Sequence, residues 1–323
     1  MRTSYAVGVD VGGTRIAAGL IERKGRIIKD AMCLTPQGGP FAVVDAIIEL
    51  VEEVTTGTQP AEVAGVGIGI PGQIDFLRQS IEFCTNLPLA GVDVRSLVMS
   101  RAKQSVTIDN DGHLAAVGEA RWGAAKGSRD FIMITVGTGV GGGMFLGGEP
   151  YRGSRGLGGE LGHTVVELNG RPCPCGGTGH LEAYLGRPAI AEKGREVAAT
   201  YRGRAILKQA KNDTNAVTAE CVLRAAVAGD EAAREILLDC GEVLGRAMVG
   251  FVNIFNPRLI LIGGGIGEAA DFMVERAAEV MRAEALAGRR DVEVAQAVLG
   301  NDAGILGAAA LSFDEHDSRG GMH

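Results

Sequence analysis

The sequence predicts an α/β protein folded in two lobes, and three observations carry this prediction. The chain has 323 residues, enough for two domains of ordinary size. Short apolar segments typical of buried strands alternate with segments of helical periodicity. Two glycine clusters of the same form, DVGGT at 10–14 and TVGTGVGGG at 135–143, each follow a predicted strand. This repetition indicates two lobes that are folded alike.

The first lobe is predicted to open with antiparallel strands at 5–10, 16–21 and 26–33. Helical periodicity then marks residues 41–54, and a continuous apolar run predicts a buried strand at 63–70. A further strand at 106–108 delivers Asp109, Asn110 and Asp111 at its carboxyl end. A helix over about 112–124 is expected to follow.

The second lobe is predicted to begin with two strands joined at glycines across 131–150. Two helices follow at 217–228 and 231–255, and then a buried strand at 259–262 that runs into a turn and a helix. A short strand at 292–295 and a helix of small residues at 303–311 complete the pattern. Residues 313–323 are predicted to be a frayed polar tail. Because no linker separates the lobes, the boundary is placed near 115–125.

Composition limits the classes of function. The net charge of −7 argues against broad nucleic-acid contact, which needs a basic face. No uncharged stretch has the length and apolarity of a membrane span, and the chain opens on a strand-like run rather than a signal peptide. The six cysteines are scattered except for one pair, unlike a secreted disulfide framework. We expect a soluble cytoplasmic protein with neither nucleic acid nor membrane as partner.

The glycine clusters favour a phosphate ligand. Three stretches satisfy G-x-G-x-x-G/A, beginning at Gly67, Gly137 and Gly265, but only the last has the strand, turn and helix of a dinucleotide site. A nicotinamide enzyme is therefore disfavoured. Either DVGGT or TVGTGVGGG alone could equally be a tight hairpin without a ligand. Together with Asp10, which could hold Mg²⁺ through water, they favour a polyphosphate held by exposed glycine N–H groups.

The segment CPCGGTGH contains part of a metal site. Cys173, Cys175 and His180 supply three donors of the kinds that zinc prefers, and a structural zinc site needs four. The alternative is a redox pair or unliganded thiols.

Nearly the whole chain, from about 6 to 311, resembles the ROK family of sugar kinases and repressors, in the actin-like ATPase superfamily. DVGGTRI and ITVGTGVGGG resemble its phosphate motifs, GIGIPGQID and TNLP its sugar-loop segments, and DNDGHLAAVGEARWGAA its catalytic segment. GELGH and CPCGGTGHLE resemble its zinc and sugar signature, NPRLILIGGG its adenosine segment and NDAGILGAAAL its closing helix.

This resemblance implies a two-lobed actin-like (ribonuclease H-like) fold with a small zinc-binding segment. The small N-terminal lobe is expected at 1–118 plus 302–316, and the large C-terminal lobe at 119–301. The zinc segment is expected at 160–182, and residues 317–323 are expected to be a flexible tail.

The resemblance also implies transfer of the ATP γ-phosphoryl group to a sugar hydroxyl. Asp111 is the implied general base, although without the resemblance its position after a strand favours a helix N-cap. Asp109 stands where the family often has Glu. The implied sugar-binding residues are Asn110, Asp111, Glu160, His163, Glu182, Gly72 and Asn86.

Nucleotide contacts are implied on both lobes. The residues expected to meet the phosphates are Asp10 through Mg²⁺, Gly12, Gly13, Thr14, Thr138 and Gly139, and those expected to lie against adenosine are Gly264 and Gly265. Arg15 either adds positive charge there or is a solvated hairpin residue.

For the metal, the resemblance implies His163 as the fourth ligand beside Cys173, Cys175 and His180. His180 departs from the family pattern, which usually has a third cysteine, so a Cys2His2 zinc site is expected. We hypothesise that His163 binds zinc through one ring nitrogen and a sugar hydroxyl through the other. Zinc would then be structural, and Mg²⁺ would serve ATP.

The implied function is an ATP-dependent hexose kinase, with glucose as the first expected substrate. The alternatives are kinases for N-acetylglucosamine, N-acetylmannosamine, fructose or allose, and a non-catalytic sugar sensor. The phosphate motif begins within ten residues of the start, which leaves no room for a winged helix ahead of it and favours the kinase class. Polyphosphate serves some relatives as donor, and the family implies a homodimer or homotetramer.

Overall fold

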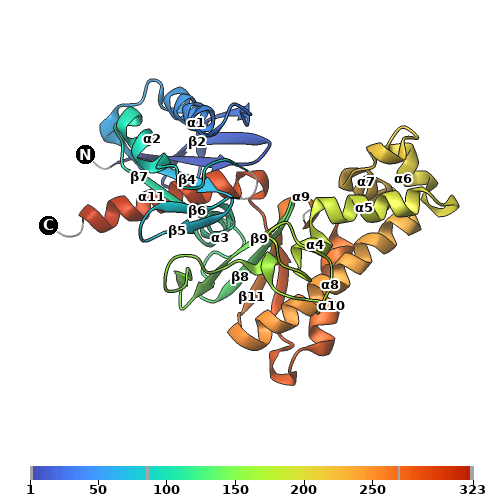
Figure 1. The fold of residues 1–323 in the computed structure, drawn as a ribbon. Helices are drawn as coiled ribbons and strands as arrows, with labels where there is room; N and C mark the ends of the chain where they lie inside the picture. Colours follow the sequence, from blue (N-terminus) through green and yellow to red (C-terminus); the bar gives the residue numbers. More distant parts are fainter. Residues whose placement is uncertain (1–2, 85–86, 268–269, 321–323) are drawn as a thin grey trace. The chain divides into compact units, whose positions relative to one another are not determined.

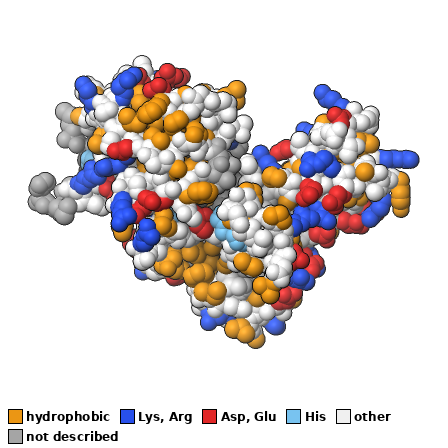
Figure 2. Space-filling view, in the orientation of Figure 1, with side chains coloured by type: hydrophobic (Ala, Val, Ile, Leu, Met, Phe, Trp, Pro, Cys, Tyr) orange, Lys and Arg blue, Asp and Glu red, His pale blue; other side chains and the backbone are white. Residues whose placement is uncertain are grey.

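The computed structural model describes residues 3–84, 87–267 and 270–320, and its helices and strands alternate as predicted (Figure 1). The chain divides into two compact units. The first contains Met1–Arg129, Gly142–Gly159 and Asn301–His323, and the second contains Asp130–Gly141 and Glu160–Gly300. On the face drawn in Figure 2, acidic and basic side chains are interspersed over both units.

A five-stranded sheet of order β3-β2-β1-β4-β7 lies at the centre of the first unit. Its strands are β1 (Tyr5–Val11), β2 (Arg15–Glu22), β3 (Ile27–Leu34), β4 (Val63–Ile70) and β7 (Val106–Asn110). β1 pairs antiparallel with β2, and β2 with β3, so the predicted antiparallel opening is confirmed. β1, β4 and β7 are parallel. Their carboxyl ends therefore meet at one edge of the sheet, the usual place for a ligand in such folds.

Helices lie on both faces of this sheet (Figure 1). α1 (Pro40–Thr55) and α2 (Val94–Ala102) lie on one face, and α3 (Asp111–Trp122) and α11 (Ala303–Gly320) lie on the other. α11 lies directly on the strands because glycine leaves room for it: a Cβ atom on Gly8 would be 1.8 Å from the Ile305 carbonyl oxygen, and one on Gly67 would be 1.9 Å from that of Ala308. A two-stranded hairpin, β5 (Gln73–Asp75) and β6 (Ser80–Phe83), follows β4.

The second sheet has the order β10-β9-β8-β11-β12. Its strands are β8 (Phe131–Val136), β9 (Val140–Leu146), β10 (Glu149–Pro150), β11 (Leu259–Gly263) and β12 (Glu293–Gln296). β11 is parallel to both β8 and β12, and all of its residues are buried. A central parallel strand covered on both faces explains the continuous apolar run LILI in the sequence.

The second unit is rich in helices. α8 packs along α10 and α7, and α5 packs against α7 and α8 (Figure 1). The helices are α4 (Glu182–Leu185), α5 (Arg187–Ala198), α6 (Arg204–Gln209), α7 (Ala219–Val227), α8 (Glu231–Phe255), α9 (Gly264–Gly267) and α10 (Asp271–Glu284). Short 3₁₀ helices in the two units occupy Pro60–Glu62, Leu161–His163, Tyr201–Gly203, Thr214–Ala216, Ala287–Arg289 and Gly300–Asp302.

The C-terminal segment differs from its prediction. A frayed tail was expected from residue 313, but α11 continues to Gly320, so that expectation is wrong as far as Gly320. Phe313 is fully buried, with the guanidinium carbons of Arg23 and Arg121 at 4.7 Å and 5.5 Å from the centre of its ring. Arg23 also pairs with Asp317 at 2.8 Å, so the additional turns of α11 contact residues that lie far away in the sequence. Within the part of the chain that the structure describes, no helix is both long and apolar enough to traverse a bilayer.

Candidate functional site

Two carboxyl groups meet at the edge of the first sheet. Asp10 is near the end of β1, and Asp111 is the first residue of α3, directly after β7. Gly69 on β4 lies beside both, since a Cβ atom there would be 3.6 Å from Asp10 Oδ1 and 3.6 Å from Asp111 Cα. Gly304 near the start of α11 also faces Asp10, and a Cβ atom on it would be 2.7 Å from Asp10 Cγ. Besides β1 and α3, which carry the two acids, β4 lies beside both and α11 lies beside Asp10.

The surroundings raise the proton affinity of both acids. Burial and, to a lesser degree, the negative charge of Asp111 together raise the pKa of Asp10 to about 7, against the opposing charge of Arg15. Burial likewise raises the pKa of Asp111, against the backbone N–H of Gly112, which donates to Asp111 Oδ1 at 2.9 Å. A carboxylate that holds a proton more tightly than usual is better suited to act as a general base.

Asn110 connects this edge to the segment after β4. Its Oδ1 accepts the backbone N–H of His113 at 3.1 Å, which makes it the N-cap of α3, and its Nδ2 donates to the Gly72 carbonyl oxygen at 2.9 Å. The N-cap alternative for Asp111 is therefore wrong. Each amide atom of Asn110 still has capacity for one further hydrogen bond. Asn86, the other residue implied for sugar binding here, lies outside the described residues.

The first glycine cluster forms the turn between β1 and β2. The Gly12 N–H donates to the Arg15 carbonyl oxygen at 2.9 Å, and Thr35 Oγ1 donates to the Gly12 carbonyl oxygen at 2.6 Å. Gly13 and Thr14 are exposed. Arg15 Nη2 donates to Asn301 Oδ1 at 3.0 Å. The turn is thus fixed by the backbone and keeps its tip open to solvent.

The second glycine cluster forms a turn in the second unit. The Gly137 N–H donates to the Gly139 carbonyl oxygen at 2.9 Å, and the Val140 N–H donates to Glu182 Oε2 at 3.0 Å. Thr138 and Glu182 line one cavity with residues of the 171–174 loop and of α5. The structure therefore brings Glu182 to the predicted phosphate segment.

The third glycine turn follows β11, as the sequence predicted. Gly264 has φ of 79° and lies against Val136, so a side chain at this position would be strained and crowded. Gly265 lies beside Arg187, and a Cβ atom on it would be 3.2 Å from Arg187 Nη2. Arg187, the first residue of α5, is a neighbour that the sequence did not indicate.

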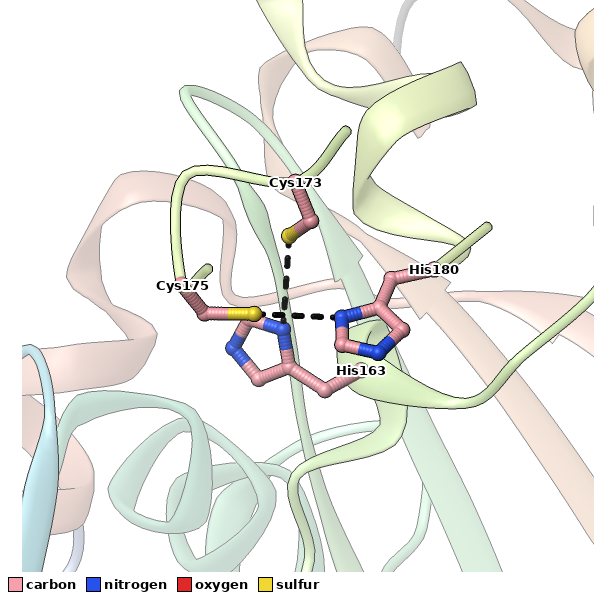
Figure 3. Close-up of side chains that lie close together, drawn as sticks. All are labelled: His163, Cys173, Cys175 and His180. Carbon is pink, nitrogen blue, oxygen red and sulfur yellow. Dashed lines mark hydrogen bonds between the residues drawn. The ribbon is translucent and has the colours of Figure 1, made fainter. Parts of the chain in front are cut away.

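Four metal-binding side chains point toward one another in the second unit (Figure 3). His163 Nδ1 lies 3.7 Å from Cys173 Sγ, and His180 Nδ1 lies 3.1 Å from Cys175 Sγ. All four donor atoms lie within 4.8 Å of one another. A tetrahedral zinc ion with bonds of about 2.0–2.3 Å separates its donors by about 3.3–3.8 Å. The predicted ligand set therefore fits zinc after small adjustments.

The thiol of Cys173 is protonated when no metal is bound. Burial raises its pKa to about 11, with Cys175 and Glu182 as lesser causes. Its Sγ donates to Glu182 Oε1 at 3.8 Å. Binding of zinc at this thiol would displace the proton, as it does at other thiolate sites.

The acidic residues predicted to bind sugar lie beside this cluster. His163 directs Nδ1 to Cys173, and its Nε2 lies 3.9 Å from Glu160 Oε2. The His163 side chain keeps 30% of its area exposed. The structure therefore brings Glu160, His163 and Glu182 to one metal-binding cluster. The Nε2 atom of His163 lies on the side of the ring away from Cys173.

Two residues near the candidate site were missed in the sequence. His113 and Arg152 both contact Asp109. Asp109 and His113 are only four residues apart in DNDGH, at the end of β7 and in the first turn of α3, and this closeness in the sequence is a signal that could have been used. Arg152 has no such signal, since 43 residues separate it from Asp109.

Comparison with known proteins agrees with this architecture. The ROK family model matches residues 6–315. The glucokinase of Thermotoga maritima is 35% identical over 94% of this chain and 96% of its own. A crystal structure of a ROK family glucokinase from Streptomyces griseus, in complex with glucose and AMPPNP, matches with a TM-score of 0.88 and 30% identity, covering 96% of this chain and 99% of that one. The xylose repressor of Bacillus subtilis is 27% identical over 97% of this chain and 78% of its own.

The similarity of the fold to that of the solved relative, and the share of the chain that the family model matches, establish the family. The predicted α/β actin-like fold is confirmed, with two mixed sheets and a His/Cys cluster typical of the family's zinc site. The chain therefore belongs to the ROK family.

Proposed function

We propose that this protein is an ATP-dependent hexose kinase that converts ATP and D-glucose to ADP and D-glucose 6-phosphate. The observation that carries the proposal is the pair Asn110 and Asp111 at the junction of β7 and α3, with the pKa of Asp111 raised by burial. Relatives that are glucokinases support the choice of reaction, as does the solved relative that binds glucose and AMPPNP.

In this proposal Asp111 takes the proton from the attacking sugar hydroxyl. Asn110 uses its remaining hydrogen-bonding capacity on a neighbouring hydroxyl, and Gly72 and Asn86 are proposed to contact the sugar as well. Glu160, His163 and Glu182 bind further hydroxyl groups. Sites that satisfy a hydroxyl in this way reject analogues that lack it.

The nucleotide is assigned to the three glycine turns. Backbone N–H groups of Gly12, Gly13, Thr14, Thr138 and Gly139 face the phosphates, and Gly264 and Gly265 lie against adenosine. Asp10 would hold Mg²⁺ through water, and the bound ion would supply positive charge to the phosphate oxygens. Polyphosphate is an alternative donor.

Zinc has a structural role in this proposal. Its four ligands, His163, Cys173, Cys175 and His180, join the segment that carries Glu160 to the segment that carries Glu182. A metal-bound imidazole has a fixed ring, so His163 can offer Nε2 to the sugar in one orientation. We further propose that the protein acts in the cytoplasm and assembles as a homodimer or homotetramer.

A second candidate is a sugar sensor without catalytic activity. The observation that favours it is the relation to a xylose repressor, which extends over most of both chains. The kinases for N-acetylglucosamine, N-acetylmannosamine, fructose and allose remain alternatives within the enzyme class.

ADP release, measured with a panel of these sugars and with ATP or polyphosphate as donor, tests the proposal. We expect release with glucose and ATP, and a loss of about 10²- to 10⁴-fold in kcat for Asp111→Asn. Asp45→Asn, on the exposed face of α1, makes the same change in charge away from the site and should keep wild-type kcat. Tight sugar binding without ADP release for any sugar would support the sensor and refute the kinase.

A further inference from the structure

A buried charged cluster lies directly beneath the proposed sugar-binding residues of the first unit. Its centre is Asp109, the fourth residue of β7, whose side chain is fully buried. Asp109 Oδ2 accepts from Arg152 Nε at 2.8 Å, and Oδ1 lies 3.3 Å from His113 Nδ1. Asp109 Oδ1 also accepts the backbone N–H of Asn110 at 2.8 Å. The carboxylate therefore contacts the main chain of a residue in the proposed active site.

The partners keep this carboxylate ionised in spite of its burial. Burial alone would raise the pKa of Asp109, but the hydrogen bond from His113 and the charge of Arg152 lower it below its usual value. Arg152 Nη2 also lies 2.8 Å from Oδ2, without the alignment of a second hydrogen bond. Since a buried charge needs partners, removal of Arg152 would leave Asp109 with His113 as its main compensating group.

Arg152 is also held in place by an aromatic ring and by the backbone of its own loop. Its guanidinium carbon lies 4.1 Å from the centre of the Phe76 ring, which follows β5. The Gly158 N–H donates to the Arg152 carbonyl oxygen at 2.8 Å, and this closes the loop after β10. Gly159 then lies against His113, because a Cβ atom on it would be 2.3 Å from His113 Nε2. The loop 151–159 therefore encloses the cluster.

We propose that Arg152, acting through Asp109 and with His113, is a positioning residue for the Asn110–Asp111 pair. This inference rests on the proposed hexose kinase function. Asp109 fixes the main chain of Asn110, and the side chain of Asn110 caps α3, whose first residue is Asp111. Loss of the Arg152 contact frees Asp109 to rotate and moves both groups relative to the sugar. Displacements of about 1 Å at a reacting group can reduce rate about 100-fold.

Steady-state kinetics of Arg152→Met, Arg152→Lys and Arg155→Met test this inference. Arg155 lies in the same loop with an exposed side chain, so Arg155→Met is the matched control. For Arg152→Met we expect kcat to fall about 100-fold and the KM for sugar to rise, while the KM for ATP is unchanged. Lysine restores the charge but neither the Nε geometry nor the flat contact with Phe76, so Arg152→Lys should recover part of the loss.

A rise in the KM for sugar without a rise in the KM for ATP distinguishes a positioning effect from a general loss of structure. Thermal unfolding of each variant gives the folded fraction at the assay temperature, and kcat is expressed per folded molecule. If Arg152→Met does not fold, His113→Gln, which retains an amide donor near Asp109, provides the same comparison. Wild-type kcat and sugar KM in these folded variants would overturn the inference, and so would equal increases in both KM values.

The test also distinguishes this inference from the proposed function. If the wild-type protein binds sugar but releases no ADP, the kinase proposal fails, and sugar affinity measured by calorimetry replaces kcat for the variants. A weaker sugar affinity for Arg152→Met but not for Arg155→Met would then still support positioning. If the wild-type protein binds none of the sugars, both proposals fail together.

Discussion

The ionised side chain of Asp10 destabilises the folded protein by an amount that depends on pH. Its pKa is raised to about 7 in the folded protein, whereas an unfolded chain releases this proton at the ordinary value of 3.8. Between these two values the folded state binds more protons than the unfolded state, so stability falls as pH rises through this window. Above pH 7 the folded protein carries the full cost of an ionised carboxylate beside Asp111.

Replacement of Asp10 by Asn removes this cost. We expect Asp10→Asn to raise Tm by roughly 2–6 °C at pH 8, with a smaller gain at pH 5, where the wild-type group is largely protonated. Activity should be lost, because the proposed Mg²⁺ contact is lost. Differential scanning calorimetry at both pH values measures the difference. Asp45→Asn is the control, and a gain for Asp10→Asn that does not change with pH would contradict this account.

At the residue scale, the sequence revealed those site residues that follow a recognisable local pattern. Asn110 and Asp111 come directly after an apolar strand, so their position at a sheet edge could be predicted. Cys173 and Cys175 are close together in the sequence. Arg152 could not be found in this way, because its partners Asp109 and Phe76 come from other elements, and an isolated arginine in a loop has no distinguishing pattern.

At the scale of elements, the packing of α11 against the first sheet is the contact most sensitive to added side-chain volume. A Cβ atom on Gly67 would overlap the Ala308 carbonyl oxygen, a backbone atom that cannot move without shifting the helix. We expect Gly67→Ala to lower the free energy of unfolding by about 1–3 kcal/mol or more. Urea denaturation followed by circular dichroism measures this change.

Gly250 provides the matched control for this prediction. It lies within α8, and a Cβ atom there would meet nothing within 4 Å. Gly250→Ala should be neutral or stabilise the protein by up to about 1 kcal/mol, since alanine is the better helix former. Equal destabilisation by the two substitutions would show that overlap with α11 is not the cause.

The metal segment is a second element that can be tested alone. Cys175→Ser removes one of four zinc ligands, and we expect zinc content to fall from about one ion per chain to well below it. Sugar KM should rise, because His163 loses its fixed orientation, while KM for ATP should change less. Metal analysis and kinetics measure these effects. Cys221→Ser, on α7, is a control that should keep its zinc.

Helices and strands could be predicted where burial alone determines the order of apolar and polar residues in the sequence. β4, an uninterrupted apolar run, and α8, with one broad apolar face, have the bounds that the sequence predicted. α2 was missed because Val94 and Val98 are its only buried residues, too few for a periodic signal. α5 was missed because it begins with Arg-Pro and buries mostly alanine, so its apolar face is weak in the sequence.

At the scale of the whole molecule, the first unit is assembled from both ends of the sequence. Its sheet comes from the N-terminal third of the chain, and α11, which packs on β1 and β4, comes after the entire second unit. This arrangement was expected only from the family resemblance, because no local pattern tells a terminal helix which sheet it will join.

A chain that ends at Asp302 should therefore lose the first unit selectively. We expect rapid hydrogen exchange in β1 and β4 and a large drop in soluble yield, because the apolar face under α11 becomes exposed. A chain that ends at Gly320 keeps the whole helix and should behave as wild type. Hydrogen exchange measured by mass spectrometry checks both, and strong protection of β1 in the shorter chain would contradict the assignment.

The position of α11 also fixes the order of events during synthesis. Translation at about 5–20 residues per second places α11 roughly 15–60 s behind β1. During that interval the newborn sheet has Gly8 and Gly67 uncovered on the face that α11 will later occupy. The second unit is made entirely within this interval and can fold while the ribosome is still at work. The unit that contains the N-terminal 129 residues is thus the last to be completed, because its final helix is made after the second unit.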